Sequence, residues 1–94
     1  MSDERLTARI TGRVQGVGFR WWVRRHADAL RLTGWVMNAN DERAVELVAE
    51  GSANALDELE RLIRQGPSGA HVEEVERRRE PASGEFDGFG IVRP

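Results

Sequence analysis

The sequence contains no cysteine and no lysine, and it has only three prolines in 94 residues. The lack of cysteine excludes disulfide bonds and thiolate metal sites, so hydrophobic packing has to hold the fold together. No apolar run approaches membrane-spanning length, and the charged start, MSDERLTARI, does not resemble a signal peptide. We therefore expect a soluble cytoplasmic protein without a membrane partner. The length allows one hydrophobic core, which predicts a single domain over residues 1–94.

A strong excess of one charge is also lacking. Fourteen arginines face sixteen acidic residues, so the net charge is −2. This balance argues against a general nucleic-acid binder. The distribution is uneven, however, because residues 5–31 contain only one acid, Asp28. The arginines in that range are Arg5, Arg9, Arg13, Arg20, Arg24, Arg25 and Arg31. Positive charge therefore gathers around the glycine-rich stretch at residues 12–20.

Hydrophobic periodicity outlines the first half of the chain. Apolar residues alternate over residues 6–12, which is typical of a half-buried strand. They recur at three- and four-residue spacing over 20–32, which predicts an amphipathic helix. Alternation returns at 34–38 and 45–49, with turn residues between them, and predicts a hairpin.

The second half repeats this order. Ser52 is suited to cap a second helix, and Gly66-Pro67 is a typical helix end. Residues 71–79 form a candidate strand whose alternation slips between Val72 and Val75, as at a β-bulge, and a short last strand falls within 85–93. The order predicts an α+β fold, a ferredoxin-like βαββαβ sandwich. Its mixed, antiparallel-rich sheet would have four to five strands and both helices on one face.

The stretch GRVQGVGFR, residues 12–20, joins the first strand to the first helix. Successive backbone N–H groups in such a turn, together with the free amides of the helix start, favour an anion, most often phosphate. Gly16 and Gly18 permit positive φ, and the guanidinium of Arg20 can bind two phosphate oxygens. Neither a Walker loop nor a dinucleotide fingerprint fits, because Phe19 follows Gly18 and position 21 is Trp. A purely structural turn is the competing interpretation.

GRVQGVGFR, followed at 34–38 by GWVMN, resembles the signature pair of the acylphosphatases. The resemblance covers nearly the whole chain and includes Glu50-Gly51, Gly66-Pro67 and Gly84-Glu85-Phe86. It implies a ferredoxin-like enzyme that hydrolyses the carboxyl–phosphate bond of acyl phosphates, needs no cofactor or metal, and is inhibited by its product, inorganic phosphate. It also implies catalytic roles for Arg20, which binds phosphate, and Asn38, which positions water. The phosphate cradle would consist of Gln15, Gly16, Val17, Gly18 and Phe19, mainly through their N–H groups, together with Arg20.

Two departures from the family pattern concern loop shape. Arg31 stands where relatives often have glycine, which would cost about 1 kcal/mol if that position needs positive φ. The hairpin after Asn38 reads Ala-Asn-Asp-Glu-Arg, without the usual Asp-Gly turn. This hairpin has the potential to move Asn38.

Two other functions are compatible with the sequence. One is a non-catalytic phosphate- or anion-binding module of ferredoxin-like fold, which would use the same loop. The other is a nucleic-acid-binding sheet, disfavoured by the acidic balance and by Trp22 and Trp35, for which core packing is expected. His26 is expected to be a surface or partly packed side chain, and we expect a monomer.

Overall fold

The computed structural model describes residues 2–94, and its elements follow the predicted order. The strands are β1 (Glu4–Arg13), β2 (Thr33–Asn38), β3 (Ala44–Gly51), β4 (His71–Pro81) and β5 (Phe89–Ile91), and the helices are α1 (Phe19–Ala29) and α2 (Ala53–Gln65). Neither helix within the described residues is long and apolar enough to cross a membrane.

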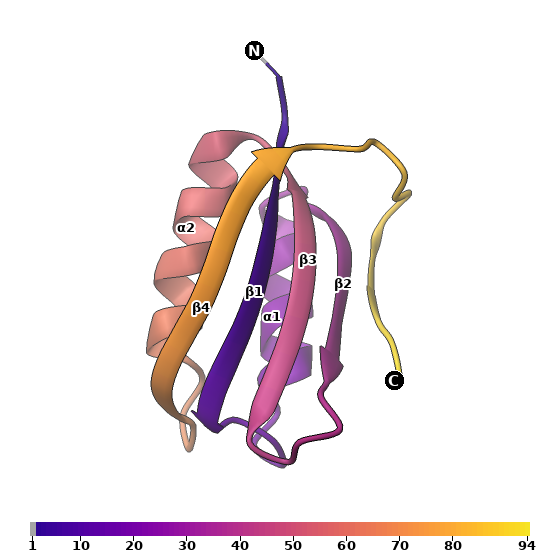
Figure 1. The fold of residues 1–94 in the computed structure, drawn as a ribbon. Coiled ribbons are helices and arrows are strands. Elements are labelled where there is room, and N and C mark those ends of the chain that lie inside the picture. Colours follow the sequence, from indigo (N-terminus) through magenta and orange to yellow (C-terminus); the bar gives the residue numbers. More distant parts are fainter. Residues whose placement is uncertain (1) are drawn as a thin grey trace.

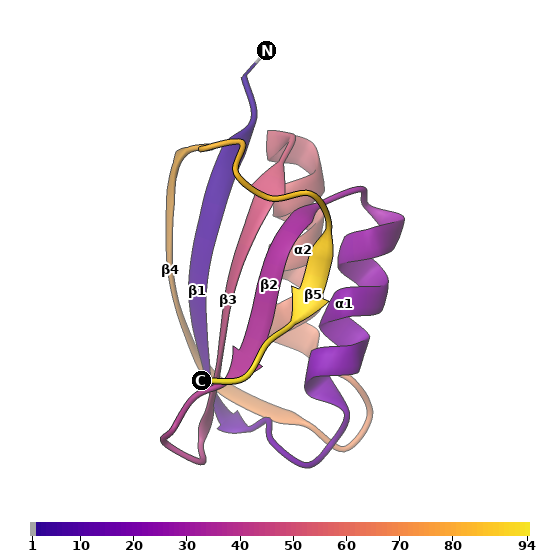
Figure 2. The same cartoon turned by 90° about the vertical axis from the view of Figure 1, so that its right-hand side faces the viewer.

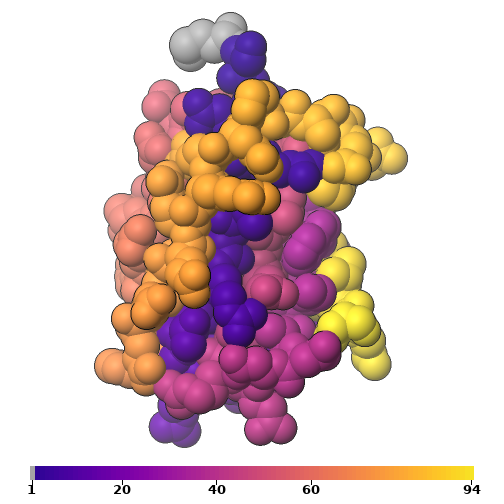
Figure 3. All heavy atoms as spheres, in the orientation of Figure 1, coloured from indigo at the N-terminus to yellow at the C-terminus, as the bar shows by residue number. Residues whose placement is uncertain are grey.

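The five strands form one sheet in the order β4-β1-β3-β2-β5. Strand β5 runs parallel to β2, and the other neighbours are antiparallel. Both helices pack on the same face of the sheet, as Figures 1 and 2 show from two directions. The opposite face is turned toward the viewer in Figures 1 and 3, and no helix of residues 2–94 lies in front of it. The prediction of a ferredoxin-like α+β fold is confirmed.

The core lies between the sheet and the two helices. Leu6 and Ile10 of β1 have no exposed surface, because alternate strand residues point toward the helices. They share one cluster with Phe19 of α1 and with Leu56 and Ile63 of α2. The apolar stripes that predicted the two helices are therefore the surfaces that cover the sheet.

The predicted slip in β4 is a real irregularity. The register between β1 and β4 shifts at Gly12, which pairs with Val72 and leaves Glu73 as the extra residue. Gly12 has a φ of 138°, and a Cβ there would lie 2.2 Å from the backbone oxygen of His71. Glycine is therefore required at the end of β1, just before the glycine-rich loop begins.

Helix α1 ends at Ala29, earlier than the periodicity predicted. The N–H of Leu32 donates to the carbonyl of Ala27 at 2.9 Å, and that of Arg31 donates to Asp28 at 3.0 Å. This bond pair is a Schellman motif, whose residue after the cap takes the left-handed conformation usually reserved for glycine. Arg31 occupies that place with a φ of 60°. The apolar spacing continued past the helix because Leu32 is buried although it lies beyond the turn.

Replacing Arg31 with glycine is expected to raise the free energy of unfolding by about 0.5–1 kcal/mol, because glycine has no Cβ to strain in this conformation. For a domain of this size, that gain corresponds to about 3–6 °C in Tm. Thermal and urea unfolding would measure it. Arg31→Ala is the matched control, since alanine keeps the Cβ. An equal gain in both variants would contradict the explanation.

The segment between β4 and β5 is held by Glu50, the last residue but one of β3. Its buried carboxylate accepts hydrogen bonds from Arg5 at 2.7 Å and from the backbone N–H groups of Ser83 and Gly84 at 2.8 and 2.9 Å. Burial alone would raise the pKa of Glu50, but these bonds outweigh it and lower the pKa to about 2. The carboxylate thus stays ionised and fixes the chain that leads into β5.

Candidate active site

The candidate site lies at the end of the sheet where β1 and β2 both finish. Both strands are antiparallel to β3, which lies between them, so β1 and β2 are parallel and their carboxyl ends share one edge. The glycine-rich loop leaves from β1, and the hairpin of residues 39–43 leaves from β2. Both connections lie at the lower end of the molecule in Figure 1, next to the start of α1.

The loop leads into the amino end of α1 through two left-handed glycines. Gly16 and Gly18 have φ values of 76° and 78°. A Cβ on either would meet nothing within 4 Å, so glycine serves the backbone conformation there and does not relieve a close contact. Gly18 is the N-cap of α1 and supplies no side-chain cap, and the first turn contains no acid. The positive end of the helix dipole therefore remains uncompensated and suits an anion.

Arg20 lies in the first turn of α1 and is half-buried. At 3.6 residues per turn it leaves the helix beside the buried positions Val23 and Ala27, on the edge of the face that covers the sheet. Among residues 2–94 its guanidinium takes part in no ion pair or side-chain hydrogen bond, whereas Arg5 and Arg9 are each bonded to carboxylates. Arg20 is thus a partly desolvated cation whose donors are available to a ligand.

Asn38 is the last residue of β2. It has the same strand parity as Val36, which has no exposed surface and belongs to the core, so its side chain lies on the face covered by α1. Its Oδ1 is the buried side-chain oxygen that lacks a hydrogen-bond partner within residues 2–94. A buried acceptor without a partner is unusual and points to an O–H or N–H donor from a ligand or solvent. Asn38 therefore lies on the helix-covered side of β2, and Arg20 lies in the first turn of α1, the helix that covers that side.

The side chain of Gln15 is directed at the hairpin that follows Asn38. Its Nε2 donates to the carbonyls of Ala44 at 2.8 Å and of Ala39 and Asp41 at 3.2 Å. The carboxamide of Gln15 is thus engaged with the hairpin, and its backbone N–H donates to no backbone carbonyl within residues 2–94. Sequence reasoning missed this contact, because nothing in the local pattern connects a loop residue with a hairpin 24–29 positions away.

Two of the three consecutive arginines of β4 are paired with carboxylates of α2. Arg77 and Arg79 both bind Glu60 of α2, at 2.8 and 2.6 Å, and Arg79 also binds Asp57 at 2.9 Å. Burial opposes ionisation of Glu60, but its hydrogen bonds to Arg77 and Arg79 lower its pKa. These arginines fasten β4 to α2, and their charge is neutralised.

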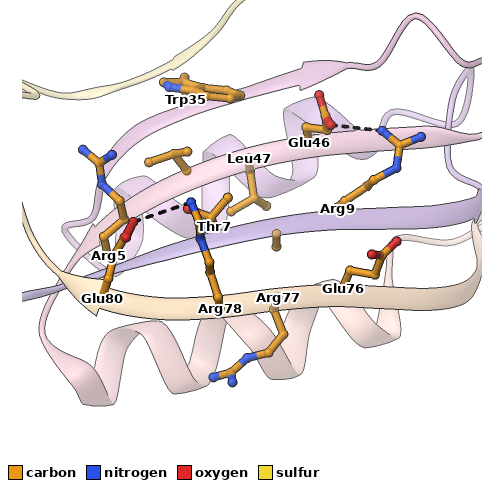
Figure 4. A pocket seen from close by; sticks show the side chains of 12 residues that line it. Arg5, Thr7, Arg9, Trp35, Glu46, Leu47, Glu76, Arg77, Arg78 and Glu80 are labelled. Carbon is orange, nitrogen blue, oxygen red and sulfur yellow. Dashed lines mark hydrogen bonds and ion pairs between the residues drawn. The ribbon is translucent and has the colours of Figure 1, made fainter.

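A groove on the open face of the sheet is lined by charges of both signs and by Trp35 (Figure 4). Arg9 binds Glu46 at 3.0 Å, so the positive charge there is already compensated. The expectation that Trp35 packs in the core is wrong, because strand alternation turns it away from the helices, opposite to Val36. Trp22, in contrast, packs against the core. Its ring lies edge-on to that of His26, with 4.6 Å between the ring centroids. Such a mixed face has no uniform positive potential for a nucleic-acid backbone.

Comparison with known proteins connects this geometry to a family. The family model described as Acylphosphatase matches residues 6–91. An acylphosphatase of Paenarthrobacter aurescens (strain TC1) is 51% identical, over 98% of this chain and 99% of that protein. This chain belongs to the acylphosphatase family. The predicted membership and the predicted enzyme class, a hydrolase of the acylphosphatase type, are thereby confirmed.

Two further acylphosphatases match this chain along nearly their whole length. The acylphosphatase of Salinibacter ruber (strain DSM 13855 / M31) is 47% identical, over 98% of this chain and 96% of that protein. The crystal structure of acylphosphatase from Bacillus subtilis superposes with a TM-score of 0.89 at 35% identity, covering 95% of this chain and 98% of that one.

Proposed function

We propose that this chain hydrolyses acyl phosphates to a carboxylate and inorganic phosphate at the end of the sheet formed by β1 and β2. The observation that carries the proposal is the Oδ1 of Asn38, which is buried without a partner among residues 2–94. It lies on the sheet face covered by α1, the helix whose uncapped first turn contains Arg20. Phosphoryl transfer needs charge stabilisation on the phosphate oxygens and a nucleophile held in line, and these groups offer both.

The phosphate would be bound by the N–H groups of residues 15–19 and by Arg20. Because the backbone donors are fixed by the loop and helix, they need no reorganisation as charge develops on the phosphate oxygens. The guanidinium adds two parallel donors and a full positive charge. The cradle grips only the phosphate, so the acyl part of the substrate contributes little to binding.

Asn38 would accept a hydrogen bond from the attacking water through Oδ1, and its Nδ2 can donate to a second acceptor. The water oxygen forms the new bond to phosphorus while the phosphorus–oxygen bond to the acyl group breaks. The bonding electrons leave with the carboxylate, which is a stable anion and needs no strong general acid. The proton of the water passes to a phosphate oxygen, so no histidine, cysteine or metal is required by this route.

A hydrolysis assay with acetyl phosphate, with and without inorganic phosphate, tests the proposal. Acetyl phosphate should be consumed, and inorganic phosphate should raise the apparent KM without lowering kcat, because product and substrate compete for one cradle. The alternative, a non-catalytic phosphate-binding module, predicts phosphate binding by calorimetry without turnover. That result would overturn the catalytic proposal while leaving the cradle intact.

A further inference from the structure

We infer that Gln15 is a positioning residue, whose carboxamide fastens the glycine-rich loop to the hairpin that carries Asn38. The inference rests on the proposed function, because it concerns how the phosphate cradle and the water-holding amide are kept in register. The contact itself does not depend on that function. Nε2 of Gln15 lies 2.8 Å from the carbonyl oxygen of Ala44 and 3.2 Å from those of Ala39 and Asp41.

The three carbonyls surround the neck of the hairpin. Ala39 directly follows Asn38, and Ala44 directly precedes Val45, which is paired with Asn38 across β2 and β3. The neck is closed by the N–H of Ala39, which donates to the carbonyl of Ala44 at 3.0 Å. An amide group has two hydrogens, so they are shared among three acceptors. Gln15 therefore binds both sides of the backbone turn that determines where Asn38 points.

The other links to the hairpin come from different parts of the fold. Arg9 binds Asp41 at 2.9 Å, the N–H of Gly12 donates to the carbonyl of Arg43 at 2.9 Å, and Arg43 binds Glu73 at 2.8 Å. These contacts attach the hairpin to β1 and β4. Within residues 2–94, Gln15 is the residue of the 14–18 loop whose side chain reaches the hairpin.

This arrangement matters because the loop and Asn38 hold different reactants. The loop amides would bind the phosphate oxygens and Asn38 would hold the water, and in-line attack requires phosphate and water to be correctly placed at once. Val14 anchors the loop in the core, whereas residues 40–43 of the hairpin are exposed. The position of the hairpin therefore depends on side-chain contacts such as that of Gln15. Losing the contact should therefore reduce turnover more than phosphate binding, which depends only on the loop and Arg20.

Gln15→Met is the decisive variant, because methionine has the same length and no N–H donor. We expect kcat for acetyl phosphate to fall about 10-fold, since small displacements of reacting groups cost large factors in rate. The inhibition constant of inorganic phosphate should change less than about threefold, because the cradle uses backbone groups. Arg43→Met is the matched control: it removes an exposed link from the same hairpin, to Glu73, and should leave kcat within about twofold. Gln15→Asn, which keeps the amide on a shorter stem, serves as a milder second variant and should shift kcat in the same direction.

A double-mutant cycle with Asn38→Ala identifies the route of the effect. If Gln15 acts by placing Asn38, Gln15→Met should change kcat less than about twofold once the Asn38 carboxamide is absent. Equal losses in both backgrounds, or a parallel loss of phosphate affinity, would overturn the inference.

Amide hydrogen exchange at Ala39 and Ala44 supplies a readout independent of activity. Exchange there should accelerate in Gln15→Met while exchange in α2 stays unchanged, and unchanged exchange at the neck would also overturn it. Wild-type protein without acetyl phosphate turnover would contradict the proposed function and leave the exchange result valid.

Discussion

Replacing Arg20 with alanine is expected to lower kcat/KM for acetyl phosphate by about 10³-fold, because the arginine stabilises charge on the transferring phosphoryl group. Inhibition by inorganic phosphate should weaken by about 10–100-fold, the usual effect of losing hydrogen bonds to a charged group. Steady-state kinetics with phosphate as a competitive inhibitor would measure both quantities.

The Arg20→Ala substitution is expected to affect phosphate binding with little effect on the stability of the fold. Its guanidinium has no carboxylate partner within residues 2–94, so its removal breaks no ion pair of the protein. The free energy of unfolding should therefore change by no more than about 0.5 kcal/mol. A half-buried cation without a protein partner is an arrangement that a bound anion completes.

Two control variants distinguish the effect of the Arg20 hydrogen bonds from the effect of losing any positive charge. Arg25→Ala removes an exposed arginine from the same helix and should leave kcat/KM within about threefold. Arg20→Lys keeps the charge and loses the paired donors, so its activity should fall between those of wild type and Arg20→Ala. If Arg20→Ala retained normal inhibition by phosphate, Arg20 would not belong to the cradle.

The main features of the fold follow from local patterns. The apolar stripes of α1 and α2, the N-cap at Ser52 and the turn at Gly66 all depend on residues close in sequence, and all are present as predicted. Ser52 accepts a hydrogen bond from the N–H of Ala55 at 3.2 Å, and Gly66 has a φ of 72°. The bulge in β4 was also visible, because a break in period-two alternation is itself local.

What the sequence could not predict depends on tertiary partners. The early end of α1 was hidden because Leu32 is buried by the sheet and prolongs the apolar spacing beyond the helix. The outward orientation of Trp35 depends on which strand face meets the helices, and a short strand leaves that choice open. The contact of Gln15 with the hairpin arises only when β1 and β2 end at the same edge. The motif implied the residues of the site, and the fold determines how they are held.

Replacing Asn38 with alanine is expected to lower kcat by about 10²–10³-fold, which is typical of losing one well-placed hydrogen-bonding group that acts in the transition state. The inhibition constant of phosphate should stay within about threefold, because Asn38 would hold water and not the anion. Asn40→Ala is the matched control: it removes the same side chain from an exposed position in the hairpin and should leave kcat within about twofold.

The stability of the Asn38→Ala variant is expected to change differently from its activity. Truncating a side chain that serves the fold lowers stability, but the Oδ1 of Asn38 accepts no hydrogen bond from the protein within residues 2–94, so its removal breaks none. Asn38→Ala should therefore keep the free energy of unfolding or raise it by up to about 1 kcal/mol while activity is lost. Urea unfolding measured on the kinetic samples would test this. A clear loss of stability would mean that Asn38 has a structural partner, and unchanged turnover would remove it from the mechanism.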